Sequence, residues 1–157
     1  MDAELDQKLR AADAKSNLQD WEYPLGFDLE AYKCLLDKIK KCAAEIETSL
    51  GLTVDVHHGQ DSTFAAEILL AMGAWKYGMR FSCFDHLFTT WGWQPQESHT
   101  LFDPQPSETL KFAIQIAQDH GFFYVEETSL QNAIYDGVLP IPEGYRFTWW
   151  DRFFDYL

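Results

Sequence analysis

The sequence has few cysteines and glycines, and it lacks the local motifs of several large protein classes. Its three cysteines are an odd number without a CxxC spacing, and Cys34 and Cys42 lie too far apart on one expected helix to be bonded. This pattern excludes a disulfide framework and predicts a reducing, cytoplasmic location. The nine glycines form neither GxGxxG, GxxxxGK[ST] nor GxSxG, which removes the motif-based support for a nucleotide-binding enzyme or a serine hydrolase.

Long apolar runs are also missing. No stretch approaches the roughly 20 apolar residues that span a bilayer. The N-terminal segment MDAELDQKLR has no apolar core of the kind that secretory signals carry. We therefore expect no secretory leader and no membrane partner.

Basic residues are scarce. The chain has 12 Lys and Arg against 25 Asp and Glu, a formal net charge of −13. Residues 85–157 carry eleven acids and three bases, residues 1–30 carry eight and three, and residues 31–84 are balanced. Phosphate backbones and anionic lipids would repel such a chain, whereas a basic protein would be attracted. The charge predicts no direct nucleic-acid binding, and it leaves two interpretations open: a surface for a basic partner, or simple solubility.

What the chain does have is enough apolar material for one core. With 157 residues and 46% hydrophobic content, we expect a single domain over residues 1–157. Residues 1–27 are expected to form a short helix and a loop packed on its body.

The strongest pattern is a helix over residues 29–50. Asp28 is a good N-cap and Gly51 is a good helix stop. Apolar residues recur at alternating steps of three and four and so form one stripe: Leu29, Tyr32, Leu36, Ile39, Ala43, Ile46 and Leu50. A core helix lying on a sheet is the favoured interpretation, and a coiled-coil dimer seam is the alternative.

Strands are expected next. Alternating apolar residues predict a hairpin of strands 52–58 and 63–70, joined by a turn at residues 59–61. Gly73 and Gly78 are expected to bracket a second connection, and strands follow at 79–83 and 122–126. Residues 84–91 fit either a helix face or a bulged strand, and we favour the strand because β-branched and aromatic residues dominate its end.

Two further helices complete the expected fold. Ser107 and Gly121 would delimit a helix over 107–120. Thr148 and Asp151 have the spacing of a capping box, which favours a terminal helix at 149–157 over a closing strand. The fold class is therefore α+β, with an antiparallel sheet of about four to five strands built on the hairpin and backed by helices 29–50 and 107–120.

Candidate catalytic and metal-binding groups are weak in the sequence. A nucleophile with a base is conceivable from Cys83, Asp85 and His86, or from Ser62 with His58 and Asp61, but each is proximity in sequence only. Cys83 and His86 would fall on opposite faces of a strand, and zinc needs two more ligands. Asp55 and Glu67 were candidates to face each other across the hairpin. We expect no catalytic residues, metal or cofactor.

Binding is the function that the residues favour. The C-terminal half combines its negative charge with large rings, namely Trp91, Trp93, Phe102, Phe122, Phe123, Tyr135, Tyr145, Trp149, Trp150, Phe153 and Phe154. Tight protein interfaces have aromatic side chains at their centre and complementary charges at their rim. The predicted contact residues are Trp93, Glu97, Asp103, Glu126, Glu127, Asp136, Trp150, Asp151 and Asp155.

The predicted function is that of a small acidic cytoplasmic protein, monomeric or homodimeric, that neutralises a basic partner by occlusion. Bacterial immunity proteins that inhibit nuclease toxins are the functional class it would fit, by analogy of charge and size rather than by a shared motif. One alternative is a dimeric secretion-type chaperone that holds an effector segment. A second is an enzyme or a small-ligand domain with a pocket near His57, His86 or His120.

Overall fold

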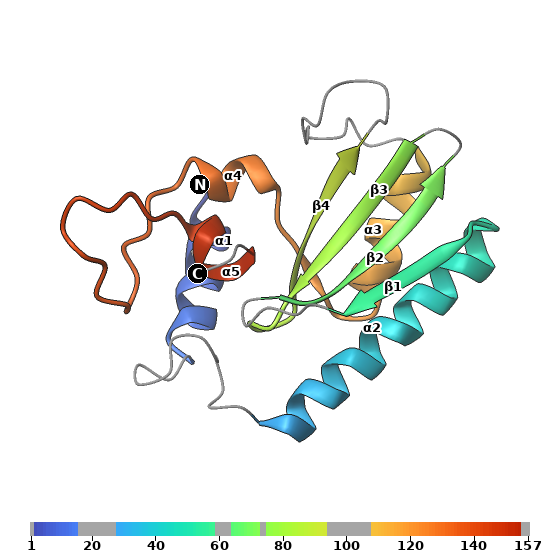
Figure 1. Ribbon diagram of the computed structural model, residues 1–157, viewed down its shortest axis with the longest axis horizontal. Helices are drawn as coiled ribbons and strands as arrows, with labels where there is room; N and C mark the ends of the chain where they lie inside the picture. The colour runs from blue at the N-terminus through green and yellow to red at the C-terminus, as the bar shows by residue number, and fades with distance from the viewer. Residues whose placement is uncertain (1, 16–27, 59–63, 73–74, 94–107, 155–157) are drawn as a thin grey trace.

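The computed structural model describes residues 2–15, 28–58, 64–72, 75–93 and 108–154. In chain order, its elements are α1 (Ala3–Asp13), α2 (Leu29–Leu50), β1 (Val54–His58), β2 (Phe64–Met72), β3 (Trp75–Ser82), β4 (Leu87–Trp93), α3 (Glu108–Asp119), β5 (Phe123–Tyr124), α4 (Glu127–Gln131) and α5 (Trp149–Phe154). The first four strands form an antiparallel sheet in chain order, and β5 adds to β4 in parallel. The fold is α+β, as the sequence predicts (Figure 1).

Helix α2 forms where its local signals place it. The Asp28 carboxylate accepts hydrogen bonds from the backbone N–H groups of Glu30 and Ala31, at 3.0 and 3.1 Å. Gly51 ends the helix in the left-handed region with φ of 62°, a conformation that glycine adopts without a Cβ penalty. The predicted helix limits are therefore confirmed.

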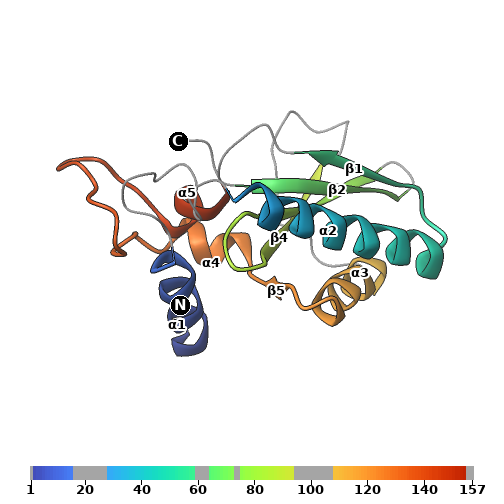
Figure 2. The same ribbon diagram turned by 90° about the horizontal axis from the view of Figure 1, so that it is seen from below.

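The apolar stripe of α2 packs inside the molecule. In Figure 2, α2 and α3 lie on one face of the sheet, and Ile39, Ala43 and Ile46 of α2 are buried there against apolar residues of β2, β3 and α3. This confirms the core-helix interpretation over the coiled-coil seam. Leu29, the first residue of the stripe, is the exception, because it is 46% exposed.

The strand limits differ from the prediction in one connection. Gly78 lies in the middle of β3 and not beside a turn, and it opposes Trp91 of β4. A Cβ atom at Gly78 would overlap the Trp91 ring, so glycine is needed here because the indole lies against the backbone. The expected pairing of Asp55 with Glu67 is also wrong, since Asp55 opposes Leu69 and His57 opposes Glu67.

Replacing Gly78 with alanine is expected to lower the free energy of unfolding by about 1–3 kcal/mol, the usual cost of overpacking. The added methyl group would displace the Trp91 indole, whose Nε1 donates to Glu67 Oε1 at 3.2 Å. Urea unfolding followed by circular dichroism measures this loss. The double variant G78A/W91L should recover part of it, and a G78A protein as stable as the parent would contradict the close packing.

A second core lies at one end of the sheet. Figures 1 and 2 show α1, α4 and α5 gathered beside the β3–β4 turn, away from α2 and α3. Phe84 of this turn and Leu87, the first residue of β4, are buried among apolar residues of the three helices, such as Leu9, Leu130 and Phe153. The predicted strand at 84–91 is thus a turn followed by β4. Of the terminal helix predicted over 149–157, Trp149–Phe154 is present as α5, and residues 155–157 lie outside the described part of the chain.

A buried ion pair joins the two ends of the described chain. Asp13 of α1 is 1% exposed and Arg152 of α5 is 0% exposed, and Arg152 Nε donates to Asp13 Oδ1 at 2.7 Å. The other carboxylate oxygen accepts from the Tyr135 hydroxyl at 2.6 Å and from the Val138 backbone N–H at 2.8 Å. Burial, reinforced by this hydrogen bond to Asp13, raises the pKa of Tyr135. Helix α1 is therefore held by specific polar contacts as well as by apolar packing.

Candidate functional site

The nine residues predicted to contact a partner are distributed over several segments. Glu97, Asp103, Asp155 and the side chain of Trp93 lie outside the described part of the chain. The remaining five belong to α4 and its N-terminal flank, to the turn after α4, and to α5: Glu126, Glu127, Asp136, Trp150 and Asp151.

Three of the predicted carboxylates have hydrogen-bond partners among the described residues, namely Glu127, Asp136 and Asp151. Asp136 accepts hydrogen bonds at 2.9 Å from Arg10 Nη2 on both of its oxygens. Asp151 Oδ2 accepts from the backbone N–H and the hydroxyl of Thr148, and the Thr148 hydroxyl accepts from the Asp151 backbone N–H. The last set is the predicted capping box. Asp151 therefore starts α5, whereas Asp136 makes an exposed ion pair with α1.

The aromatic part of the prediction needs correction. Five of the rings proposed as surface anchors are core residues with at most 6% exposure: Phe122, Tyr135, Trp149, Phe153 and Phe154. Phe122 is buried in the core between the sheet and helices α2 and α3, and the other four are buried in the second core with α1 and α4. The sequence does not reveal either arrangement. Tyr145 is the exception at 67% exposure, and the Trp150 ring is half-buried, stacked on Phe154 with ring centroids 5.3 Å apart.

The predicted residue Glu126 borders an acidic hollow of about 330 Å³ between α1 and the segment from β5 to α4. Asp2 and Glu4 of the α1 N-terminus line the same hollow, together with Phe123 and Tyr124. All three acidic residues are exposed, and no Lys or Arg is among the described residues that line it. The hollow therefore gathers three exposed acidic residues, of which Asp2 also caps α1 by accepting from the Leu5 backbone N–H at 2.8 Å.

Asp2 and Glu4 were not among the predicted site residues. The only signal for them in the sequence is the net charge of residues 1–30. Their place beside Glu126 depends on how α1 docks, which is a tertiary feature. Glu127, the next predicted residue, is half-buried, and its Oε1 accepts from the Gln131 side chain at 2.6 Å.

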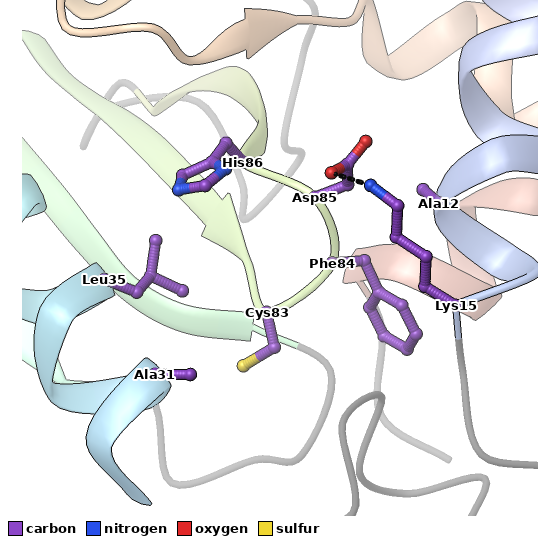
Figure 3. Close-up of a pocket in the computed structure, with 8 residues that line it drawn as sticks. All are labelled: Ala12, Lys15, Ala31, Leu35, Cys83, Phe84, Asp85 and His86. Carbon is purple, nitrogen blue, oxygen red and sulfur yellow. Dashed lines mark hydrogen bonds and ion pairs between the residues drawn. The ribbon is translucent and has the colours of Figure 1, made fainter. Parts of the chain in front are cut away.

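The β3–β4 turn borders a second cavity, of about 260 Å³, which Figure 3 shows in close-up. Its walls come from the turn, from the C-terminal end of α1 and from the N-terminal part of α2. Asp85 and His86 both have positive φ, 44° and 61°, a region that residues with a Cβ rarely adopt. Such strained residues cluster at functional sites, so the turn is a candidate for ligand binding.

Charge at this turn is shared between one carboxylate and nearby lysines. Asp85 accepts from Lys8 Nζ at 2.9 Å and from Lys15 Nζ at 2.5 Å. Burial alone would raise the pKa of Asp85, but these hydrogen bonds and charges outweigh burial and lower the pKa. Burial lowers the pKa of His86, and the positive charge of Lys38 lowers it further. The Asp85 carboxylate is thus ionised and the His86 ring favours its neutral form at neutral pH.

The arrangement at the turn is not that of a nucleophile with its base. In Figure 3 the Cys83 sulfur points toward α2, the Asp85 carboxylate points toward Lys15, and the His86 ring lies apart from both. No group of three His, Cys, Asp or Glu side chains within the described ranges is placed to hold a metal ion. Asp61 and Ser62, from the other candidate set, lie outside the described residues.

None of the helices in the described part of the chain combines the length and apolar character that a membrane crossing requires. Comparison of the chain with protein-family models, with curated proteins and with solved structures finds no match. The function must therefore be argued from the two hollows and from the charge of the chain itself.

Proposed function

We propose that this protein binds a basic protein partner, and that the acidic hollow between α1 and α4 is part of the contact surface. The observation that carries the proposal is the convergence of the carboxylates of Asp2, Glu4 and Glu126 around one hollow, on a chain of net charge −13. Like charges brought together raise the free energy of the fold. A cationic partner would relieve this repulsion, so the arrangement favours binding over mere solubility.

Apolar contacts would come from the segment that follows α4. Among the described residues, Ile134, Val138 and Tyr145 of this segment are large apolar side chains with 57%, 45% and 67% exposure. Interfaces combine an apolar centre with a charged rim. We propose that these three residues supply the apolar contacts of the interface; of them, only Tyr145 was among the rings named from the sequence.

The proposed mechanism is occlusion without catalysis. Nucleases and other nucleic-acid-binding proteins have positive clefts because they hold phosphates, and an acidic protein seated there excludes the substrate. Long-range attraction would mainly raise the association rate, which falls as salt screens the charges. A cytoplasmic immunity protein for a nuclease toxin is the proposed biological form of this activity.

A charge-matched pair of variants tests the site. The probe is a 20-residue peptide rich in lysine and arginine, with a glutamine-substituted peptide as its neutral counterpart. We expect the variant E4Q/E126Q to bind the basic peptide at least fivefold more weakly than the parent in 50 mM salt, measured by fluorescence anisotropy. The control D37N/E47Q, which removes two exposed charges from α2, should change the affinity less than twofold.

Equal losses in the two variants would show that only total charge matters and would overturn the hollow as the contact site. Affinity that is insensitive to salt between 50 and 300 mM would contradict the electrostatic proposal as a whole. A stable dimer in sedimentation, with unaltered peptide binding in E4Q/E126Q, would favour the chaperone alternative instead.

A further inference from the structure

The cavity at the β3–β4 turn differs in charge from the rest of this acidic protein. Among the described residues, Lys8 and Lys15 both form ion pairs with the single carboxylate of Asp85, so two positive charges share one negative charge there. Lys38 is a further cation on the His86 side of the turn, since its Nζ lies 4.8 Å from the Phe122 ring centroid and that centroid lies 5.8 Å from the His86 ring centroid. Two lysines therefore bind one carboxylate and a third lies near His86, in a chain where acids outnumber bases two to one.

The direction of the His86 shift supports a positive potential at this place. After burial, the charges of Lys38, Lys8 and Lys15 all lower the pKa of His86, and only Asp85 acts in the opposite direction. Distant carboxylates have little influence here, because charges more than about 8 Å away are largely screened at physiological salt.

The other described residues that line the cavity are mostly apolar. Ala31 and Leu35 of α2 lie one helical turn apart on one side, and Ala12 of α1 and Phe84 of the turn also line it (Figure 3). Its volume of about 260 Å³ exceeds the roughly 150 Å³ of a cavity known to accept benzene. A molecule with one ring and a short polar group would fit.

We propose that this cavity binds a small organic carboxylate that consists of a single ring or a branched apolar body and one anionic group. The apolar body lies against Ala31, Leu35 and Phe84. The anionic group lies at the Lys15 side of the cavity, where the ammonium group is shared with Asp85. The neutral His86 ring keeps one N–H group that can donate a further hydrogen bond.

The same features disfavour other small ligands. A cation would be repelled by the lysines, and a polyanion such as a nucleotide would exceed the cavity volume of about 260 Å³. An uncharged molecule of the same shape would gain the apolar contacts but not the contact with Lys15. The difference in binding affinity between a carboxylate and the corresponding amide therefore measures the electrostatic contribution of Lys15.

Phenylacetate and phenylacetamide are the matched probes for the test. We expect the full-length protein to bind phenylacetate at least fivefold more tightly than phenylacetamide, measured by saturation-transfer-difference NMR titration. In the variant K15Q this preference should fall below twofold. The control K33Q removes a lysine of α2 that pairs with Glu30 and does not line the cavity, and it should keep the preference.

A second variant tests the location independently of charge. Replacing Ala31 with leucine fills the cavity and should lower the affinity for both probes at least fivefold. The circular dichroism spectrum and the unfolding midpoint verify that the variant is folded. Three outcomes would each overturn the proposal. The parent protein binds neither probe, it binds both with equal affinity, or K15Q and K33Q change the preference equally.

Discussion

Replacing Asp13 with alanine is expected to lower the free energy of unfolding by about 3–5 kcal/mol, the cost of removing one partner from a buried ion pair. The substitution leaves the Arg152 guanidinium, which is 0% exposed, without its carboxylate. It also removes the acceptor for the Tyr135 hydroxyl and the Val138 backbone N–H. Urea denaturation monitored by circular dichroism gives the free energy of unfolding directly.

Two variants make this result specific. Asp136 also accepts hydrogen bonds from an arginine, Arg10, but its side chain is 63% exposed, so D136N should leave the unfolding midpoint nearly unchanged because exposed pairs contribute little. The double variant D13A/R152M should recover part of the loss, since an apolar side chain tolerates burial better than an isolated charge. A D13A protein that loses less than about 1 kcal/mol would contradict the importance of the pair.

Replacing Trp149 with alanine is expected to cost about 3–5 kcal/mol of stability, as large core truncations do. Trp149 is 0% exposed, its ring stacks on Phe153 with centroids 5.6 Å apart, and it meets Tyr135 edge-on at 4.7 Å. The result distinguishes the core position of this ring from the surface position that the sequence pattern predicted. Thermal unfolding followed by near-ultraviolet circular dichroism reports both the stability and the packing of the rings.

The exposed ring Tyr145 provides the control. Its replacement with alanine should change the free energy of unfolding by no more than about 0.5 kcal/mol, the usual range for surface positions. Under the proposed function, Y145A lowers the affinity for the partner without unfolding the protein, whereas W149A lowers the stability of the fold. Equal destabilisation by Y145A and W149A would show that the second core is not organised around α5 as described.

The helices show what short-range patterns can predict. Asp28 and Gly51 delimit α2 through contacts within three or four residues, and the Thr148–Asp151 capping box starts α5 in the same way. Strand alternation likewise identified the first hairpin. The position of Gly78 was missed because its reason lies across the sheet in Trp91, and a lone glycine in sequence resembles a turn residue.

The candidate sites were predicted less completely than the fold. Glu126 was expected to contact a partner and does line the acidic hollow, but Asp2 and Glu4 join it from more than 100 positions away. The Cys83, Asp85 and His86 cluster was recognised as local chemistry, whereas its lysine neighbours on α1 were not. Nothing in the local pattern shows which helix will dock on which turn.

The sequence by itself determined the long helix α2, helix α3, the first hairpin and the start of α5, because capping hydrogen bonds, glycine conformation and apolar periodicity act over a few residues. The short helix α4 and the β3–β4 turn were not predicted from it. It also determined the overall negative charge. The tertiary structure alone decided which rings are buried, which carboxylates are paired and where negative charge converges. These properties depend on contacts such as the one between Asp13 and Arg152, whose two ends meet only when the chain has folded.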